Sequence, residues 1–158
     1  MARYELRRRS LLIAAAGYGL LMLWLLFFQR TSQAARMDLE TYLHTYTNLV
    51  PFQTVRLFWR VLRHGEEYAS WLPWHAFVNL GGNILMFVPL GIFLPLLSPK
   101  QRHWGRFLLT VFMLILCVEL LQLATMLGSC DIDDLILNVI GASLGFFLWK
   151  HTPLHRLL

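Results

Sequence analysis

Three carboxylates stand together in the C-terminal part of the chain, directly before an apolar segment. Asp131, Asp133 and Asp134 open the stretch DIDDLILNVIGASLG. An aspartate at the start of a helix accepts hydrogen bonds from backbone N–H groups that lack partners, and it favours the positive end of the helix dipole. Asp133 is the residue we expect to serve as a plain cap. Three carboxylates exceed what capping requires, so the stretch indicates a further role.

Other polar side chains interrupt the neighbouring apolar segments at helical spacing. Asn79 and Asn83 are four residues apart, Glu119 and Gln122 are three apart, and Asn138 follows the aspartates in their own segment. Such spacings place each pair on one face of a helix. A carboxylate within a membrane helix is costly and normally faces a partner inside the bundle. We therefore expect these side chains to meet at one level of the bundle.

A cluster of carboxylate and amide oxygens suits more than one kind of chemistry. It suits a divalent cation such as Mg²⁺ or Ca²⁺, for which Asp131, Asp134 and Glu119 are the candidate ligands; the alternative is that no cofactor binds. It also suits a proton relay or a general base, with Glu119 and Asp134 as candidate catalytic residues. The structural alternative is that these residues only cap and join helices. The candidate ligand-binding residues are Asn79, Asn83, Glu119, Gln122, Asp131, Asp133, Asp134 and Asn138.

The elements that must position these residues are long apolar runs separated by short charged blocks. The chain has 158 residues, of which 57% are hydrophobic and 15% charged. This pattern predicts an all-α polytopic membrane protein with a single domain over residues 1–158. We expect four membrane-spanning helices at about 11–28, 77–97, 107–127 and 132–150. In the last of them, Gly141 and Gly145 form a G-x-x-x-G step that allows a neighbouring helix to approach closely.

Residues 29–75 are expected to form an outside loop, with a helical turn or two before residue 48 and a short amphipathic helix after it. The stretch VPFQTVRLFWRVLRHG alternates apolar and basic residues at helical spacing, which is typical of a helix at a membrane surface. The basic residues could grip an anionic group such as a phosphate, or form only a solvated face. The predicted apolar face consists of Val55, Phe58, Trp59 and Leu62, and the basic face of Arg56, Arg60 and Arg63.

Basic residues also flank the spans and predict the topology. Arginines precede the first span, a basic loop stands between the second and third, and a basic tail follows the fourth, whereas the loop GSCD has no basic residue. The positive-inside rule therefore predicts that both termini are cytoplasmic. In that topology the intramembrane polar residues of three helices fall in the outer half, so the site would open to the outside. The net charge of +5 is explained by these flanks, which excludes nucleic acid as the expected partner.

Four motifs occur in a defined order along the chain. They are NLVPF at 48–52, NLGGNILMFVPLG at 79–91, ELLQL at 119–123 and DIDDLILNVIGASLG at 131–145. In order and spacing they resemble the VanZ-like family of small bacterial membrane proteins, over about residues 48–150. The positions that correspond to the family pattern are Asn48, Pro51, Phe52, Asn79, Gly82, Asn83, Phe87, Pro89, Gly91, Glu119, Gln122, Asp131, Asp133, Asp134, Asn138, Gly141 and Gly145.

The resemblance implies a function in the bacterial cell envelope. The family is named for a protein linked to low-level resistance to the glycopeptide teicoplanin. Many members have an arginine shortly before the aspartates, about where this chain has Gly128. The first hypothesis is a protein of the bacterial cytoplasmic membrane whose outward-facing polar pocket binds a lipid-linked cell-wall precursor or a lipoglycopeptide. The alternative is a metal-assisted membrane enzyme that acts on a lipid phosphate.

Overall fold

Four long helices form the body of the molecule in the computed structural model, which describes residues 2–28, 37–65, 69 and 71–156. Within these residues, four helices are long and apolar enough to cross a membrane. They confirm the predicted all-α polytopic membrane fold. Their bounds are α1 (Ala2–Leu23), which continues into the π-helical turn η1 (Trp24–Phe28), α4 (Leu72–Leu97), α5 (Trp104–Thr125) and α6 (Ile132–His151).

The helices begin or end up to nine residues away from the predicted spans, for reasons that can be found in the residues at their ends. The first helix begins at Ala2 rather than at residue 11, because the basic N-terminal segment is itself helical. Helix α4 begins at Leu72 rather than at 77, with Pro73 in its first turn, where the missing N–H of proline costs no hydrogen bond. Helix α5 ends at Thr125 because Met126 adopts a left-handed conformation with φ 55°.

The segment between α1 and α4 contains two helices and a short strand among its described residues. Helix α2 (Leu39–Tyr46) is capped by Asp38, whose side chain accepts a hydrogen bond from the Thr41 amide at 3.0 Å. Strand β1 (Thr47–Asn48) pairs in parallel with β2 (Cys130–Asp131), and α3 (Gln53–Arg63) follows β1. The helical turn or two expected before residue 48 corresponds to α2, whereas strand β1 was not predicted. Residues 29–36, 66–68 and 70 of the predicted loop lie outside the described residues.

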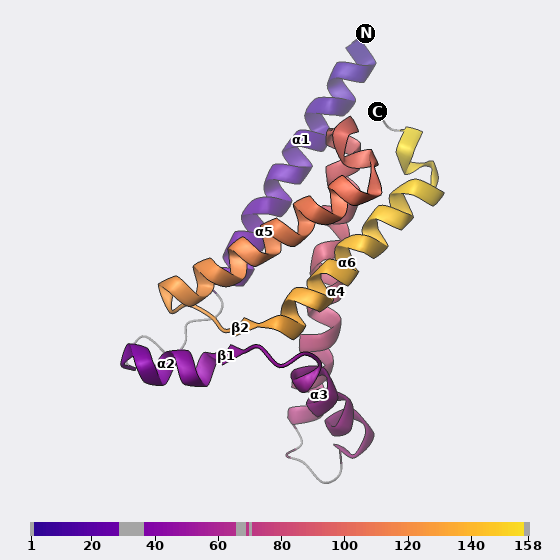
Figure 1. The fold of residues 1–158 in the computed structure, drawn as a ribbon. Coiled ribbons are helices and arrows are strands. Elements are labelled where there is room, and N and C mark those ends of the chain that lie inside the picture. The colour runs from indigo at the N-terminus through magenta and orange to yellow at the C-terminus, as the bar shows by residue number, and fades with distance from the viewer. Residues whose placement is uncertain (1, 29–36, 66–68, 70, 157–158) are drawn as a thin grey trace.

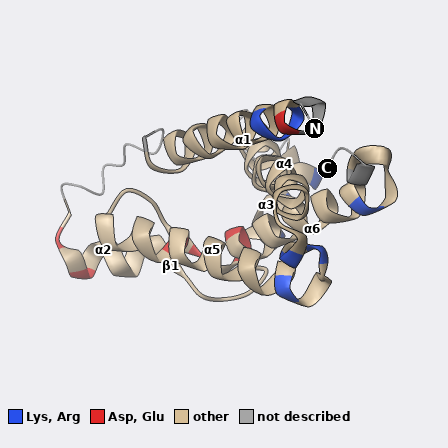
Figure 2. Ribbon diagram, turned by 90° about the horizontal axis from the view of Figure 1, so that it is seen from above, with Lys and Arg blue, Asp and Glu red and all other residues tan. Residues whose placement is uncertain are grey.

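The two ends of the molecule differ in what they carry. Both termini lie at one end, together with the short helices η4 (Pro99–Arg102) and η5 (Pro153–Arg156), while α2 and α3 lie at the other end (Figure 1). Lys and Arg residues mark the end of α1 beside the N-terminus, and Asp and Glu residues mark α2 (Figure 2). The bundle therefore has a terminal end and an α2–α3 end.

Helices α4 and α6 pack with their backbones in contact. A Cβ atom added to Gly141 would lie 2.0 Å from the Ile84 carbonyl oxygen, and one added to Gly91 would lie 1.9 Å from the Ala142 carbonyl oxygen. Gly145 meets the carbonyl of Val88 in the same way, at 2.0 Å. Only glycine permits such an approach, as the G-x-x-x-G step predicted.

Helix α3 packs on the bundle through part of its predicted apolar face and through Val61 beside it. Val61 is fully buried, and Thr54 and Phe58 are half-buried. Of the predicted apolar face, Trp59 is 58% exposed and Leu62 is 38% exposed. The predicted apolar face is therefore only partly buried, because an amphipathic pattern gives the period of a helix but not the direction in which the rest of the protein lies.

Candidate functional site

Asp131 is the carboxylate that caps α6. Its side chain accepts a hydrogen bond from the Asp133 amide at 2.8 Å, so Asp131 has the capping role that the sequence assigned to Asp133. Asp131 also accepts hydrogen bonds from the Thr54 hydroxyl at 2.6 Å and from the Asn48 amide group at 3.2 Å. These contacts join the start of α6 to strand β1 and to the first turn of α3.

Asp133 acts at the start of a different helix. It is fully buried, and its carboxylate accepts hydrogen bonds from the backbone N–H groups of Phe52 and Val55, the latter at 3.0 Å. Phe52 precedes α3 in a left-handed conformation with φ 63°, which residues other than glycine seldom adopt. Pro51 stands before it in the position that proline favours in such a turn, which the Gln53 amide closes on the Val50 carbonyl at 3.3 Å. Asp133 therefore holds the turn that starts α3.

The remaining carboxylates contact the transmembrane helices around them. The Asn83 amide group on α4 donates a hydrogen bond to Asp134 on α6, and both side chains are buried. Glu119 on α5 is also buried, and one of its oxygens accepts a hydrogen bond from the Asp131 amide at 3.4 Å. Polar residues of α4, α5 and α6 thus meet near the start of α6.

Gln122 lies on the side of α5 that faces η1. Its amide group donates a hydrogen bond to the Leu26 carbonyl at 2.8 Å. Its side chain also packs against Gly128, where an added Cβ atom would lie 3.2 Å from three Gln122 side-chain atoms. The buried Tyr42 hydroxyl donates to the Gly128 carbonyl, which joins α2 to the turn after α5. A larger residue at position 128, such as the arginine of many relatives, would need this packing to change.

A cavity of about 290 Å³ lies between η1 and α4. Its polar residues occupy successive turns of one face of α4, and Asn83 among them contacts Asp134. The Asn79 side-chain oxygen is buried without a hydrogen-bond partner within the described structure, and so is that of Asn138 on α6. The lining residues are Leu25, Leu26, His75, Val78, Asn79, Gly82, Asn83 and Met86.

The candidate metal ligands do not come together as a metal site requires. Among the described residues, no group of three His, Cys, Asp or Glu side chains is arranged to hold a metal ion. Asp131 contacts the α3 turn, Asp134 contacts Asn83, and Glu119 accepts from the backbone of β2. Burial raises the pKa of the Cys130 thiol next to them, and the charges of Glu119 and Asp131 raise it further, so this thiol stays protonated at neutral pH.

Comparison with known proteins identifies the family. A family model described as VanZ/LLP1 matches residues 15–155. The chain belongs to the VanZ/LLP1 family. Protein VanZ of Enterococcus faecium is 28% identical to this VanZ/LLP1 chain over 122 residues, which make up 74% of each protein. No solved structure gives a significant match.

The structure of this VanZ/LLP1 chain separates its motif residues into two groups. Asn48, Asp131 and Asp133 hold the turn before α3, while Asn83 and Asp134 join α4 to α6 beside the cavity. The sequence did not indicate Thr54 as a partner of Asp131. No local pattern marks this pair, because the two residues are 77 positions apart in the chain.

Proposed function

We propose that this VanZ/LLP1 membrane protein holds a polar group of a lipid-linked cell-wall precursor or of a lipoglycopeptide in the cavity between η1 and α4. Through this binding it contributes to glycopeptide resistance at the bacterial cytoplasmic membrane. The observation that carries the proposal is that His75, Asn79 and Asn83 line one cavity. Polar side chains on a transmembrane helix are costly unless they have partners, and a ligand would supply them.

The chemistry of the cavity favours a neutral ligand group that donates hydrogen bonds. The Asn79 side-chain oxygen is buried and lacks a partner, so it favours a hydroxyl or amide N–H group. Asn83 already donates to Asp134, which fixes the orientation of its amide group. Sugar hydroxyls and peptide amides, which both proposed ligand classes carry, supply such donors.

The size of the cavity limits how much of a ligand it can hold. Pockets for whole drug-sized ligands span roughly 300–1,000 Å³. At about 290 Å³, this cavity suits one sugar ring or one peptide unit. The remainder of a lipid-linked precursor or a lipoglycopeptide would lie outside it, in the bilayer or in the water layer.

The position of the cavity supports access from outside the cell. It lies on η1 and the first half of α4, at the α2–α3 end of the molecule and opposite both termini (Figure 1). With both termini in the cytoplasm, as the basic flanks favour, this end reaches the outer leaflet. Lipoglycopeptides and exported cell-wall precursors are present there.

Teicoplanin susceptibility of an expressing strain tests the proposal. Asn79→Ala and Asn83→Ala should abolish the tolerance that the wild-type chain confers, because they remove polar groups from the cavity wall. Gln101→Ala is the matched control, since it removes an amide group at the terminal end of the bundle. Equal amounts of each variant in the membrane must be shown by immunoblotting. Unchanged tolerance in both cavity variants would contradict the proposal.

Direct binding to the purified chain in detergent separates binding from resistance. Loss of one hydrogen bond costs about 1 kcal/mol, so Asn79→Ala should weaken binding of teicoplanin or of a lipid-linked precursor about fivefold. Isothermal titration with each compound measures this change. Saturable binding that is identical in wild type and in both cavity variants would place the ligand elsewhere.

A further inference from the structure

Helix α3 presents three arginines on the face that points away from the bundle. Arg56, Arg60 and Arg63 are four and three residues apart, so they share one side of the helix, and all three are exposed. The opposite side carries the buried Val61. Within the described part of the chain, no carboxylate forms an ion pair with these guanidinium groups. Because the three side chains are exposed, the charge of this face is accessible to an external anion.

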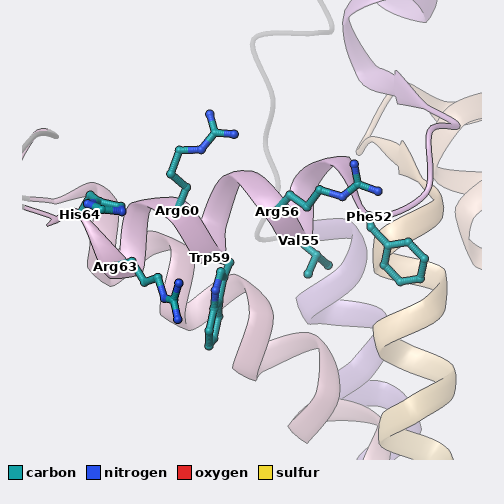
Figure 3. A pocket seen from close by; sticks show the side chains of 7 residues that line it. All are labelled: Phe52, Val55, Arg56, Trp59, Arg60, Arg63 and His64. Carbon is teal, nitrogen blue, oxygen red and sulfur yellow. The ribbon is translucent and has the colours of Figure 1, made fainter.

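Aromatic side chains accompany the arginines around a hollow of about 520 Å³ on the same helix. The Arg63 guanidinium carbon lies 5.6 Å from the centre of the Trp59 ring, and both side chains project to the same side of α3 (Figure 3). Arg60 points away from the neighbouring helices (Figure 3). The hollow is lined by Phe52, Val55, Arg56, Trp59, Arg60, Arg63 and His64.

The neighbouring part of α4 places this hollow at the depth of lipid headgroups. Trp71 and Trp74, at the start of α4, are 63% and 69% exposed. Exposed tryptophans at the end of a membrane helix mark the boundary between acyl chains and headgroups. The ring of His75 packs against those of Phe58 on α3, at 6.4 Å, and Trp71, at 6.1 Å, so α3 lies beside this boundary.

We propose that the arginine face of α3 binds the phosphate of an anionic phospholipid in the adjacent leaflet. A guanidinium group matches the geometry of a phosphate with two parallel hydrogen bonds, which an ammonium group cannot reproduce. Phe52 and Trp59, at 48% and 58% exposed, supply the apolar contact that a lipid offers and a free phosphate lacks. This inference is independent of the ligand proposed for the cavity.

Asp131 and Asp133 hold this face in position. Asp133 accepts hydrogen bonds from the first backbone N–H groups of α3, and Asp131 accepts one from the Thr54 hydroxyl. The helix therefore does not have to become ordered when it meets the lipid, which reduces the entropic cost of binding. The acidic motif of α6 thus serves to present a basic surface at the membrane.

Lipid retention by the purified full-length chain tests the inference. The protein is reconstituted in nanodiscs of phosphatidylcholine and phosphatidylglycerol, and bound lipid is counted by native mass spectrometry after release. Wild type should retain phosphatidylglycerol in preference to phosphatidylcholine. The variant R56Q/R60Q/R63Q should lose this preference, by about fivefold for each charge removed. An unchanged preference would overturn the proposal.

A charge-matched variant and a competing anion complete the experiment. R56K/R60K/R63K keeps the charge but not the forked donors, so it should retain an intermediate preference. Retention equal to wild type would overturn the guanidinium contact. Inorganic phosphate, added at the same ionic strength as chloride, should leave the retained phosphatidylglycerol unchanged. Displacement by inorganic phosphate would show a site for free phosphate and overturn the assignment to lipid.

Discussion

Adjacent residues of the acidic motif contact different helices. Asp133 accepts hydrogen bonds from the backbone at the start of α3, whereas Asp134 accepts one from Asn83 on α4. Successive residues of a helix point about 100° apart, so neighbouring carboxylates at its first turn can hold separate elements. A count of acidic residues alone does not distinguish such roles from a shared site.

Replacement of Asp133 should destabilise the protein. Asp133→Ala leaves the partly buried N–H groups of Phe52 and Val55 without this acceptor, which we expect to cost about 2–4 kcal/mol. Asp133→Asn keeps one carbonyl oxygen and should cost less. Thermal unfolding in detergent, followed by tryptophan fluorescence, measures both changes. Glu40→Gln alters an exposed carboxylate of α2 and should leave the melting temperature unchanged; an equal loss there would contradict the prediction.

For single residues, the sequence predicts which polar side chains are buried better than it predicts their hydrogen-bond partners. Glu119 and Asn83 face the protein interior as expected, because a polar side chain in a membrane helix has few other places to lie. The partners of Asp133 are backbone N–H groups 78 and 81 residues away in the chain. Every residue except proline has such a group, so no residue type marks it in the sequence.

Among the elements, α4 and α6 form the closest pair because glycines remove the side chains between them. The contacts of Gly91, Gly141 and Gly145 with facing carbonyl groups occur along little more than one turn of α6. In a membrane, close backbone contact of this kind is a main source of attraction between helices. The stability of the bundle should therefore depend on these glycines more than on others.

Alanine substitutions of glycines in this pair test that dependence. Gly141→Ala places a Cβ atom 2.0 Å from the Ile84 carbonyl oxygen, and overpacking of this kind typically costs about 1–3 kcal/mol. Gly81→Ala is the matched control on α4, because nothing lies within 4 Å of its added Cβ atom. It should be neutral or gain up to about 1 kcal/mol from helix propensity. Similar melting temperatures for the two variants would refute the predicted role of the contact.

The long helices could be predicted from the sequence, whereas the shortest elements could not. The spanning helices follow from long apolar runs, and α3 follows from its alternation of apolar and basic residues. Strands β1 and β2 have only two residues each, which is too short for a repeating pattern to show. Their pairing joins residues 47–48 to 130–131, a contact that depends on how the helices between them are arranged.

The whole molecule has a polarity that its basic residues predict. Both termini lie at the end opposite α2 and α3, and the basic segments before α1, between α4 and α5 and after α6 all belong to the terminal end (Figure 1). Positive residues in short flanking segments are retained in the cytoplasm. Among the residues that the structure describes, the arginines of α3 are the exception, and a lipid-binding role would account for their place at the other end.

Reporter fusions test this orientation. Green fluorescent protein fused after Leu158 should fluoresce, and alkaline phosphatase fused at the same place should be inactive, because the C-terminus is expected in the cytoplasm. Alkaline phosphatase fused after Ser129 should be active. Activities measured in intact cells and corrected for expression decide between the two orientations. The reverse pattern would place the cavity on the cytoplasmic side and exclude the proposed access from outside.

The glycine contacts also determine which part of the molecule can yield when a ligand enters. Helix α4 cannot slide along α6 without clashes between carbonyl oxygens and Cα atoms. The two helices therefore move as one rigid unit. The opposite wall of the cavity is Leu25 and Leu26, which follow α1. The contacts of this helix with its neighbours include the hydrogen bonds from Tyr18 to the Met86 carbonyl and from Gln122 to the Leu26 carbonyl. Entry of a bulkier ligand therefore requires α1 to move outward while α4 and α6 stay in place.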